Sequence, residues 1–175
     1  MRFDAPPPHE WVIDDAQTQP SVISGHGLVA TRAISVGTVV VRFGGHAVSS
    51  LDYAQLIAAA GTDTAAFVGS ISIDDGVKLV FPPDSRAHFV NHNCCPNLWY
   101  VDPFQLEARE AIRTGEELTV DYATLSDATD YYSMRCTCRS VACRSAVTNS
   151  DWQRPELRGR YGDHWVPALR RRVGR

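Results

Sequence analysis

Long hydrophobic runs are missing from this sequence. The longest apolar stretches, residues 39–41 and 56–60 among them, fall far short of the roughly 20 residues that a membrane-spanning helix requires, so we expect no contact with a membrane. The start of the chain also lacks the basic residues and the apolar stretch of about 7–15 residues that mark a secretory signal. We therefore expect a cytoplasmic protein of bacterial type, or a nuclear one if the source is eukaryotic.

The sequence also lacks internal repeats and any strong compositional bias. Hydrophobic residues make up 44% and charged residues 21% of the 175 positions, values that are close to globular averages and argue against a disordered or fibrous chain. A chain of this length is the size of one ordinary domain and buries a core without disulfide bonds. The composition predicts a soluble, folded, single-domain protein.

Lysine is scarce, and the charges are unevenly distributed. Lys78 is the only lysine among 17 basic residues. Residues 1–130 hold 7 basic and 17 acidic side chains, a formal charge of −10, whereas residues 131–175 hold 10 basic and 3 acidic side chains, a formal charge of +7. An acidic body attracts a cationic peptide and repels nucleic acid, although an ordinary solvated surface shows the same pattern. The charge distribution favours a basic partner and makes direct nucleic-acid binding an unattractive hypothesis.

Apolar residues and turn residues alternate in a way that predicts a mainly β fold with small helices. β-branched runs and alternating patterns between glycine, proline and aspartate turns are typical of short strands. Asp74, Asp75 and Gly76 form a predicted hairpin turn between two of these strands. The predicted strands are residues 11–13, 22–23, 38–41, 71–73, 77–81, 98–101 and 105–108, with one turn or strand at 118–120.

Three helices are predicted. Residues 51–60 have helical spacing of apolar side chains, with Ser49 or Ser50 as the N-cap and Gly61 as the stop. Residues 154–160 and 165–172 form two short helices near the C-terminus, because proline suits a first helical turn and Gly162 ends the first of them.

Five cysteines favour a metal site. They stand at positions 94, 95, 136, 138 and 143, and disulfides are rare inside cells. Cys136, Cys138 and Cys143 lie within eight residues, and zinc binds four sulfur or nitrogen ligands. A fourth ligand from Cys94 or Cys95 would clip the end of the chain back onto its middle. The alternatives are buried, unligated cysteines and a catalytic thiol near a histidine.

Three arginines, at positions 135, 139 and 144, stand beside these cysteines. Their guanidinium groups would moderate the negative charge of a four-thiolate zinc centre, or they are plain surface residues.

Four motifs resemble one known family. Residues 89–97 read F-V-N-H-N-C-C-P-N and resemble the SET-domain signature F-[IV]-N-H-x-C-x-P-N. Residues 115–122 read G-E-E-L-T-V-D-Y and resemble the second signature, G-E-E-L-T-x-D-Y. Residues 25–28, G-H-G-L, are similar to the glycine motif that opens the domain, and residues 136–143 match the post-SET zinc motif C-x-C-x4-C. The resemblance to SET-domain protein-lysine N-methyltransferases covers about residues 21–145.

This resemblance implies an α+β, mainly β fold of several small sheets. The segment that ends at Tyr122 would pass beneath a loop as a pseudoknot, a rare exception to unthreaded chains. The implied division is an N-terminal arm at 1–20, the SET domain at 21–125, a post-SET zinc segment at 126–149 and a basic, aromatic tail at 150–175, which holds the short C-terminal helices.

The resemblance also implies the roles of individual residues. Tyr122 matches the catalytic tyrosine, which orients the amine of a lysine in a protein substrate. Gly25, His26, Gly27 and Leu28 would contact S-adenosylmethionine through their backbone, with Gly27 as the most informative position, because glycine lets a chain approach a ligand closely. A turn is the alternative interpretation of this glycine motif, and a packed core residue that of Tyr122.

Asn91 and His92 would contact the methionine and adenine parts of the same cofactor, or else form a satisfied buried turn. Cys94 matches the zinc ligand in the family motif and completes a set with Cys136, Cys138 and Cys143, which leaves Cys95 as a spare thiol. Trp152 either covers the cofactor or lysine channel or packs in the core.

Departures from the family pattern leave some properties open. Val120 stands where many members carry Phe or Tyr, so the number of methyl groups transferred is not predicted. His88 replaces a frequent Arg, and Phe43 stands where a Tyr is common. The rival functions are a catalytically inactive SET-type protein-interaction module and a zinc-containing nucleic-acid binder.

Overall fold

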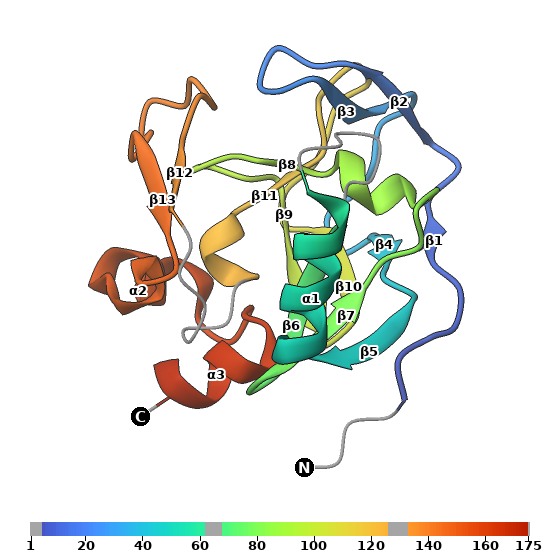
Figure 1. Ribbon diagram of the computed structural model, residues 1–175. Helices are drawn as coiled ribbons and strands as arrows, with labels where there is room; N and C mark the ends of the chain where they lie inside the picture. Colours follow the sequence, from blue (N-terminus) through green and yellow to red (C-terminus); the bar gives the residue numbers. More distant parts are fainter. Residues whose placement is uncertain (1–4, 62–67, 126–132, 175) are drawn as a thin grey trace.

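The computed structural model describes residues 5–61, 68–125 and 133–174. Short strands in several small sheets make up most of the regular structure, and the helices are few and short (Figure 1). The predicted mainly β fold is confirmed. The polar stretch 126–130, where the sequence predicts the start of the zinc segment, lies outside the described residues. None of the described helices is long and apolar enough to cross a membrane.

The largest sheet forms much of the core. Its order is β1 (Trp11–Val12), β4 (Val39–Arg42), β10 (Gln105–Ala108) and β9 (Leu98–Asp102), all antiparallel. The valines of β4 make it a central strand, because β-branched side chains suit a pleated surface that is buried. These strands confirm the predicted ones to within two residues.

One predicted strand is wrong. Residues 22–23 are not extended in a sheet; they belong to the bend between β2 (Ala16–Pro20) and β3 (His26–Ala30). The Ser21 hydroxyl accepts hydrogen bonds from the backbone N–H groups of the residues two and three positions later, at 2.9 and 3.3 Å. Such a local serine bond competes with strand pairing, so the apolar pair at 22–23 lies in a turn.

An inserted unit follows β4. It consists of β5 (His46–Ser49), α1 (Ser50–Ala60), β6 (Ser70–Asp74) and β7 (Val77–Val80), with the sheet order β5-β7-β6. The predicted hairpin turn joins β6 to β7, and its glycine has φ of +69°.

Helix α1 forms where the sequence predicts it. The Ser49 side chain accepts a hydrogen bond from the Asp52 N–H, and Gly61 ends the helix at φ +60°. The helix buries none of its residues, and Leu51, Leu56 and Ile57 are each more than 40% exposed. Capping and local spacing therefore form this helix without a core-facing side.

The two signature motifs lie side by side at the centre of the molecule (Figure 1). β8 (Asn91–His92) pairs in parallel with β11 (Thr119–Val120), and the 3-10 helix η2 (Arg86–Phe89) precedes β8. This pairing joins segments about thirty residues apart in sequence, which is the contact that the predicted pseudoknot requires.

The C-terminal part begins with η3 (Tyr122–Thr124) and the hairpin of β12 (Ser133–Arg135) and β13 (Ala146–Thr148). Three short helices follow, and they confirm both helices predicted near the C-terminus. They are η4 (Asp151–Gln153), α2 (Pro155–Tyr161) and α3 (Pro167–Val173).

The C-terminal helices belong to the main core. Tyr161, Trp165 and Leu169 are almost completely buried in the same cluster as the strands of the large sheet. Two arginines of α3 also pair with acidic residues of the β6–β7 turn: Arg171 with Asp74, and Arg172 with Asp75. Part of the charge asymmetry seen in the sequence therefore serves to dock the tail onto the body.

Candidate active site and metal centre

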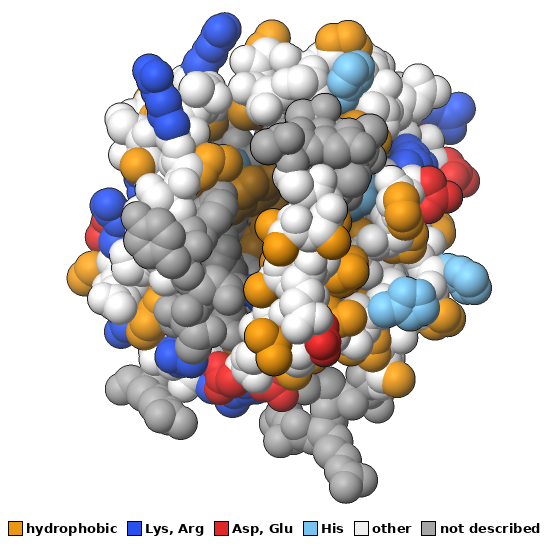
Figure 2. Space-filling view, in the orientation of Figure 1, with side chains coloured by type: hydrophobic (Ala, Val, Ile, Leu, Met, Phe, Trp, Pro, Cys, Tyr) orange, Lys and Arg blue, Asp and Glu red, His pale blue; other side chains and the backbone are white. Residues whose placement is uncertain are grey.

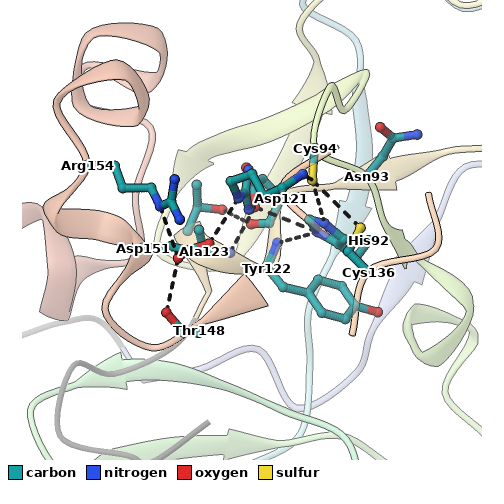
Figure 3. Close-up of polar contacts among 12 residues, drawn as sticks. His92, Asn93, Cys94, Asp121, Tyr122, Ala123, Cys136, Thr148, Asp151 and Arg154 are labelled. Carbon is teal, nitrogen blue, oxygen red and sulfur yellow. Dashed lines mark hydrogen bonds and ion pairs between the residues drawn. The ribbon is translucent and has the colours of Figure 1, made fainter. Parts of the chain in front are cut away.

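Tyr122 stands at the junction of the two motifs. It is the first residue of η3, directly after β11, and its backbone N–H donates to Nδ1 of His92 at 3.2 Å. Its hydroxyl donates to the carbonyl of Val90 at 3.0 Å, and its ring centroid lies 5.4 Å from that of His92 (Figure 3). The side chain is only partly buried, and the bond to Val90 fixes the direction of the predicted catalytic hydroxyl.

Asn91 ties the glycine loop to the second motif. Its side-chain nitrogen lies within hydrogen-bond distance of the Ser21 hydroxyl (3.2 Å), the His26 carbonyl (2.9 Å) and the Glu117 carboxylate (2.7 Å). The side-chain nitrogen of Asn91 thus forms its hydrogen bonds within the chain, and these bonds hold the loop that precedes β3. Glu117 was missed by sequence reasoning, because only the pairing of β8 with β11 brings it next to Asn91.

The two glycines of the motif at residues 25–28 differ in their surroundings: the space beside Gly25 is open, and the space beside Gly27 is filled. Gly25 has φ of +48°, and no atom lies within 4 Å of where its Cβ would stand, so a ligand can approach its backbone. A Cβ on Gly27 would lie 2.2 Å from Glu117 Oε1, so glycine is needed here to make room for a carboxylate. His26 is exposed, and Leu28 is fully buried and offers only its backbone.

Replacing Gly27 with alanine is expected to lower the free energy of unfolding by about 1–3 kcal/mol, the usual cost of overpacking. Glu117 cannot swing aside freely, because the Ser21 hydroxyl contacts both of its carboxylate oxygens at 2.8–2.9 Å. Gly159→Ala in α2 is the matched control, since no atom lies within 4 Å of its new Cβ. The control should gain about 0.5–1 kcal/mol from better helix propensity. Urea unfolding measures both; equal values for the two variants would contradict the proposed crowding at Gly27.

A buried cluster of metal-ligating atoms lies beside Tyr122. One atom each from His92, Cys94, Cys136 and Cys138 lies within 4.8 Å of all the others. The sulfurs of Cys94 and Cys136 are 3.7 Å apart. Tetrahedral zinc with bonds of about 2.3 Å would hold two sulfurs roughly 3.8 Å apart, so the cluster fits zinc.

Cys143 lies at the edge of this cluster. Its sulfur is 4.0 Å from the carbonyl oxygen of Cys136 and accepts a hydrogen bond from the backbone N–H of Ser145. Cys95, in contrast, is exposed, whereas Cys94 is fully buried. The structure therefore separates the two adjacent cysteines as the family motif implies.

His92 is the nitrogen member of this cluster, and its hydrogen bonds bear on whether it or Cys143 is the fourth ligand. Burial lowers the pKa of His92 to about 4, so its ring is neutral at pH 7. The Tyr122 N–H donates to Nδ1, which favours a ring proton on Nε2, 3.3 Å from the sulfur of Cys94, whereas the Asp121 carboxylate at 3.7 Å favours one on Nδ1. An N–H group has no lone pair for a metal. The cluster in the structure thus contains His92 and three of the four predicted cysteine ligands, and Cys143 as the fourth ligand stays a prediction.

The environment of the thiols favours a bound cation. Burial raises the pKa of Cys94 to about 11. Burial also acts to raise the pKa of Cys138, but backbone hydrogen bonds from Cys94 and Ser140 outweigh it and lower that pKa to about 7. Zinc binding needs deprotonated thiols, and a divalent cation would stabilise their charges in this buried position.

A buried polar network joins the metal cluster to the C-terminal helices (Figure 3). Arg144 is 7% exposed; it makes two hydrogen bonds to Asp121, at 2.6 and 2.8 Å, and one to Asp151 at 2.9 Å. Of the three arginines near the cysteines, Arg135 and Arg139 are exposed, and only Arg144 has a buried side chain. Sequence spacing gave no signal for these contacts, because the partners are 7 and 23 residues away.

Trp152 lies in η4, partly buried against the main core. The guanidinium of Arg158 stands 5.3 Å from the centre of its ring. Trp152 therefore packs against the core, and its predicted role as a cover over the cofactor or lysine channel stays a prediction.

Residues 25–123 match the sequence model of the family described as SET domain. The chain is 29% identical over 157 residues to "Histone-lysine N-methyltransferase, H3 lysine-4 specific" of Mycosarcoma maydis, which covers 82% of this chain and 9% of that protein. It is 30% identical over 135 residues to "Histone-lysine N-methyltransferase ash1" of Drosophila melanogaster, covering 70% of this chain and 6% of that protein. The chain thus spans under a tenth of the length of these relatives.

Solved structures show the same fold. The methyltransferase domain of human histone-lysine N-methyltransferase SETMAR superposes with a TM-score of 0.58 at 20% identity, over 74% of this chain and 56% of that one. KRYPTONITE, solved in complex with mCHG DNA and SAH, superposes with a TM-score of 0.57 at 21% identity, over 75% of this chain and 28% of that one.

Proposed function

Because this chain belongs to the SET-domain family, we propose that it transfers a methyl group from S-adenosylmethionine to the side-chain amine of a lysine in a protein substrate. The observation that carries the proposal is the parallel pairing of β8 with β11. This pairing places Tyr122 against His92, and the neighbouring Asn91 holds the loop around Gly25. The residues that match the family motifs therefore meet at one place.

S-adenosylmethionine supplies the methyl group on a positively charged sulfur. The open backbone at Gly25, beside the loop held by Asn91, fits the binding of this cofactor. Alignment of the amine with the methyl group provides much of the rate of such a displacement, and it is the protein that provides the alignment.

Tyr122 would orient the incoming amine. A free lysine with a pKa near 10.4 is neutral in only about one molecule in a thousand at pH 7.4, so the site must favour the neutral form. A desolvated site lowers the pKa of a lysine. The hydroxyl of Tyr122 donates a hydrogen bond to the Val90 carbonyl at 3.0 Å, and this bond fixes the direction of the phenol group. We assign Tyr122 an orienting role and leave the proton to depart through water.

Zinc would be structural in this proposal. Cys94, Cys136, Cys138 and Cys143 would hold it, and the ion would fix the end of the chain next to Tyr122. A role in folding suits a site whose ligands are all protein groups, since a catalytic zinc keeps one position open.

A hollow on the molecular surface supports a peptide substrate. Figure 2 shows it beside α1, with hydrophobic side chains in the hollow and along the helix. The exposed Leu51, Leu56 and Ile57 of α1 fit contacts with a bound peptide. The acidic formal charge of residues 1–130 favours a basic one, although the tail neutralises part of it. A cytoplasmic location belongs to the proposal, because free thiols persist in reducing compartments.

The test is methyl transfer by the purified, zinc-loaded protein from radiolabelled S-adenosylmethionine to a mixture of basic proteins, with calorimetry of cofactor binding. We expect label in the basic proteins and none in the enzyme. Its single lysine, Lys78, is 5% exposed and its ammonium donates to Ser72 at 2.7 Å, so it cannot reach an active site. If neither label nor cofactor binding is found, the chain is a SET-type interaction module.

A further inference from the structure

Asp121 is the most heavily bonded carboxylate beside the site. It is completely buried, and it directly precedes Tyr122. Both terminal nitrogens of Arg144 donate to it, the Tyr161 hydroxyl donates to it at 2.8 Å, and the Ala123 N–H donates to it at 3.0 Å. The last of these bonds caps η3, the short helix that Tyr122 begins. The orientation of this carboxylate is thereby linked to the backbone at Tyr122.

The two side chains that donate to Asp121 come from the C-terminal part of the chain, Arg144 from the cysteine segment and Tyr161 from α2. Arg144 follows the zinc-ligand candidate Cys143, and its own backbone N–H donates to the sulfur of Cys94 at 3.3 Å. Tyr161 is the last residue of α2. The Asp121 carboxylate therefore has all of its side-chain donors only when the cysteine segment and α2 are both packed against the body of the protein.

We propose that Arg144 and Tyr161 are positioning residues for Tyr122, acting through Asp121. The first motif holds Tyr122 from one side, through His92 and Val90, and the two positioning residues hold it from the other. The proposal rests on the proposed function where it takes Tyr122 as the catalytic residue. Buried ion pairs often add little net stability, because desolvating both charges offsets their attraction, so a role in geometry explains this pair better than stability alone.

The variants Arg144→Lys and Tyr161→Phe test the proposal. Lysine keeps the charge but cannot make the forked contact with Asp121. Phenylalanine removes one hydroxyl and leaves the zinc segment intact, so this variant should fold even if the first does not. Arg154→Ala is the matched control, because Arg154 pairs with Asp151 in the same network at 3.3 Å and is 46% exposed.

Two readouts separate positioning from simple destabilisation. With one zinc per chain retained, we expect kcat to fall about a hundredfold in Arg144→Lys and about tenfold in Tyr161→Phe, with KM for the peptide unchanged, as for a small misplacement of a reacting group. Amide hydrogen exchange at Tyr122 should accelerate in both variants. The Arg154→Ala control should leave both readouts at wild-type values.

The exchange readout decides the proposal even if the wild-type protein transfers no methyl group. Exchange at Tyr122 is compared with that of amides in the large sheet, which follow global stability, so the difference reports on the backbone at Tyr122. Unchanged exchange at Tyr122 in Tyr161→Phe and Arg144→Lys would overturn the proposal, whatever the activity. Faster exchange at Tyr122 without any wild-type activity would support the linkage and contradict the proposed function.

Discussion

Tyr122→Phe is expected to lower kcat for methyl transfer by about a hundredfold or more while the protein stays folded and still binds S-adenosylmethionine, because only the orientation of the amine is lost. The hydroxyl is the one polar group of this side chain, and its bond to the Val90 carbonyl fixes its direction. Loss of that bond should cost about 0.5–1.5 kcal/mol of stability, too little to unfold a domain. Single-turnover methyl transfer with the labelled cofactor measures the rate, and calorimetry measures cofactor binding.

Tyr53→Phe is the control for this experiment. The hydroxyl of Tyr53 also donates to a backbone carbonyl, that of Val68, at 3.1 Å, but it lies in α1. The two variants therefore lose the same kind of hydrogen bond. A similar loss of stability with unchanged kcat in Tyr53→Phe would assign the rate effect to the position of the hydroxyl. Wild-type kcat in Tyr122→Phe would remove Tyr122 from the catalytic role.

The parts of the site that were predictable from the sequence are those carried by contiguous motifs. The segments around Asn91 and Tyr122 could be read directly, and their pairing in β8 and β11 follows from the fold that the resemblance implies. Helix α1 was predictable because its cap, Ser49, and its stop, Gly61, are local signals. Gly27 was singled out as a cofactor contact, which stays a prediction, and the structure supplies a different reason for glycine at this position, the crowding by Glu117.

Contacts between distant side chains were not predictable. Asp121 is 23 residues from Arg144 and 40 from Tyr161, and no periodicity or motif links such positions. The charge asymmetry was interpreted only as a surface property, whereas part of it joins Arg171 to Asp74 within the molecule. Both pairs depend on the complete fold, and the buried charge of Asp121 in addition requires specific partners.

Substitutions of the two adjacent cysteines should have opposite results. Cys94→Ser should lose zinc and much of the free energy of unfolding, whereas Cys95→Ser should keep both. Cys94 is fully buried, and its sulfur stands 3.7 Å from that of Cys136, which is 42 residues away. A metal link across a loop of that length should contribute about 4 kcal/mol by analogy with a disulfide. Cys95 is exposed, so its substitution should change stability by about 0.5 kcal/mol or less.

Zinc content by atomic absorption and thermal unfolding measure this difference, and two further variants identify the fourth ligand. Cys143→Ser should lose zinc as Cys94→Ser does. His92→Asn should keep one zinc per chain with affinity reduced about 10- to 100-fold, as for a residue that only orients a ligand, because its Nε2 lies within hydrogen-bond distance of the Cys94 sulfur. Loss of zinc in His92→Asn but not in Cys143→Ser would reverse the assignment. Full zinc content in Cys94→Ser would contradict Cys94 as a ligand and the metal link between it and Cys136.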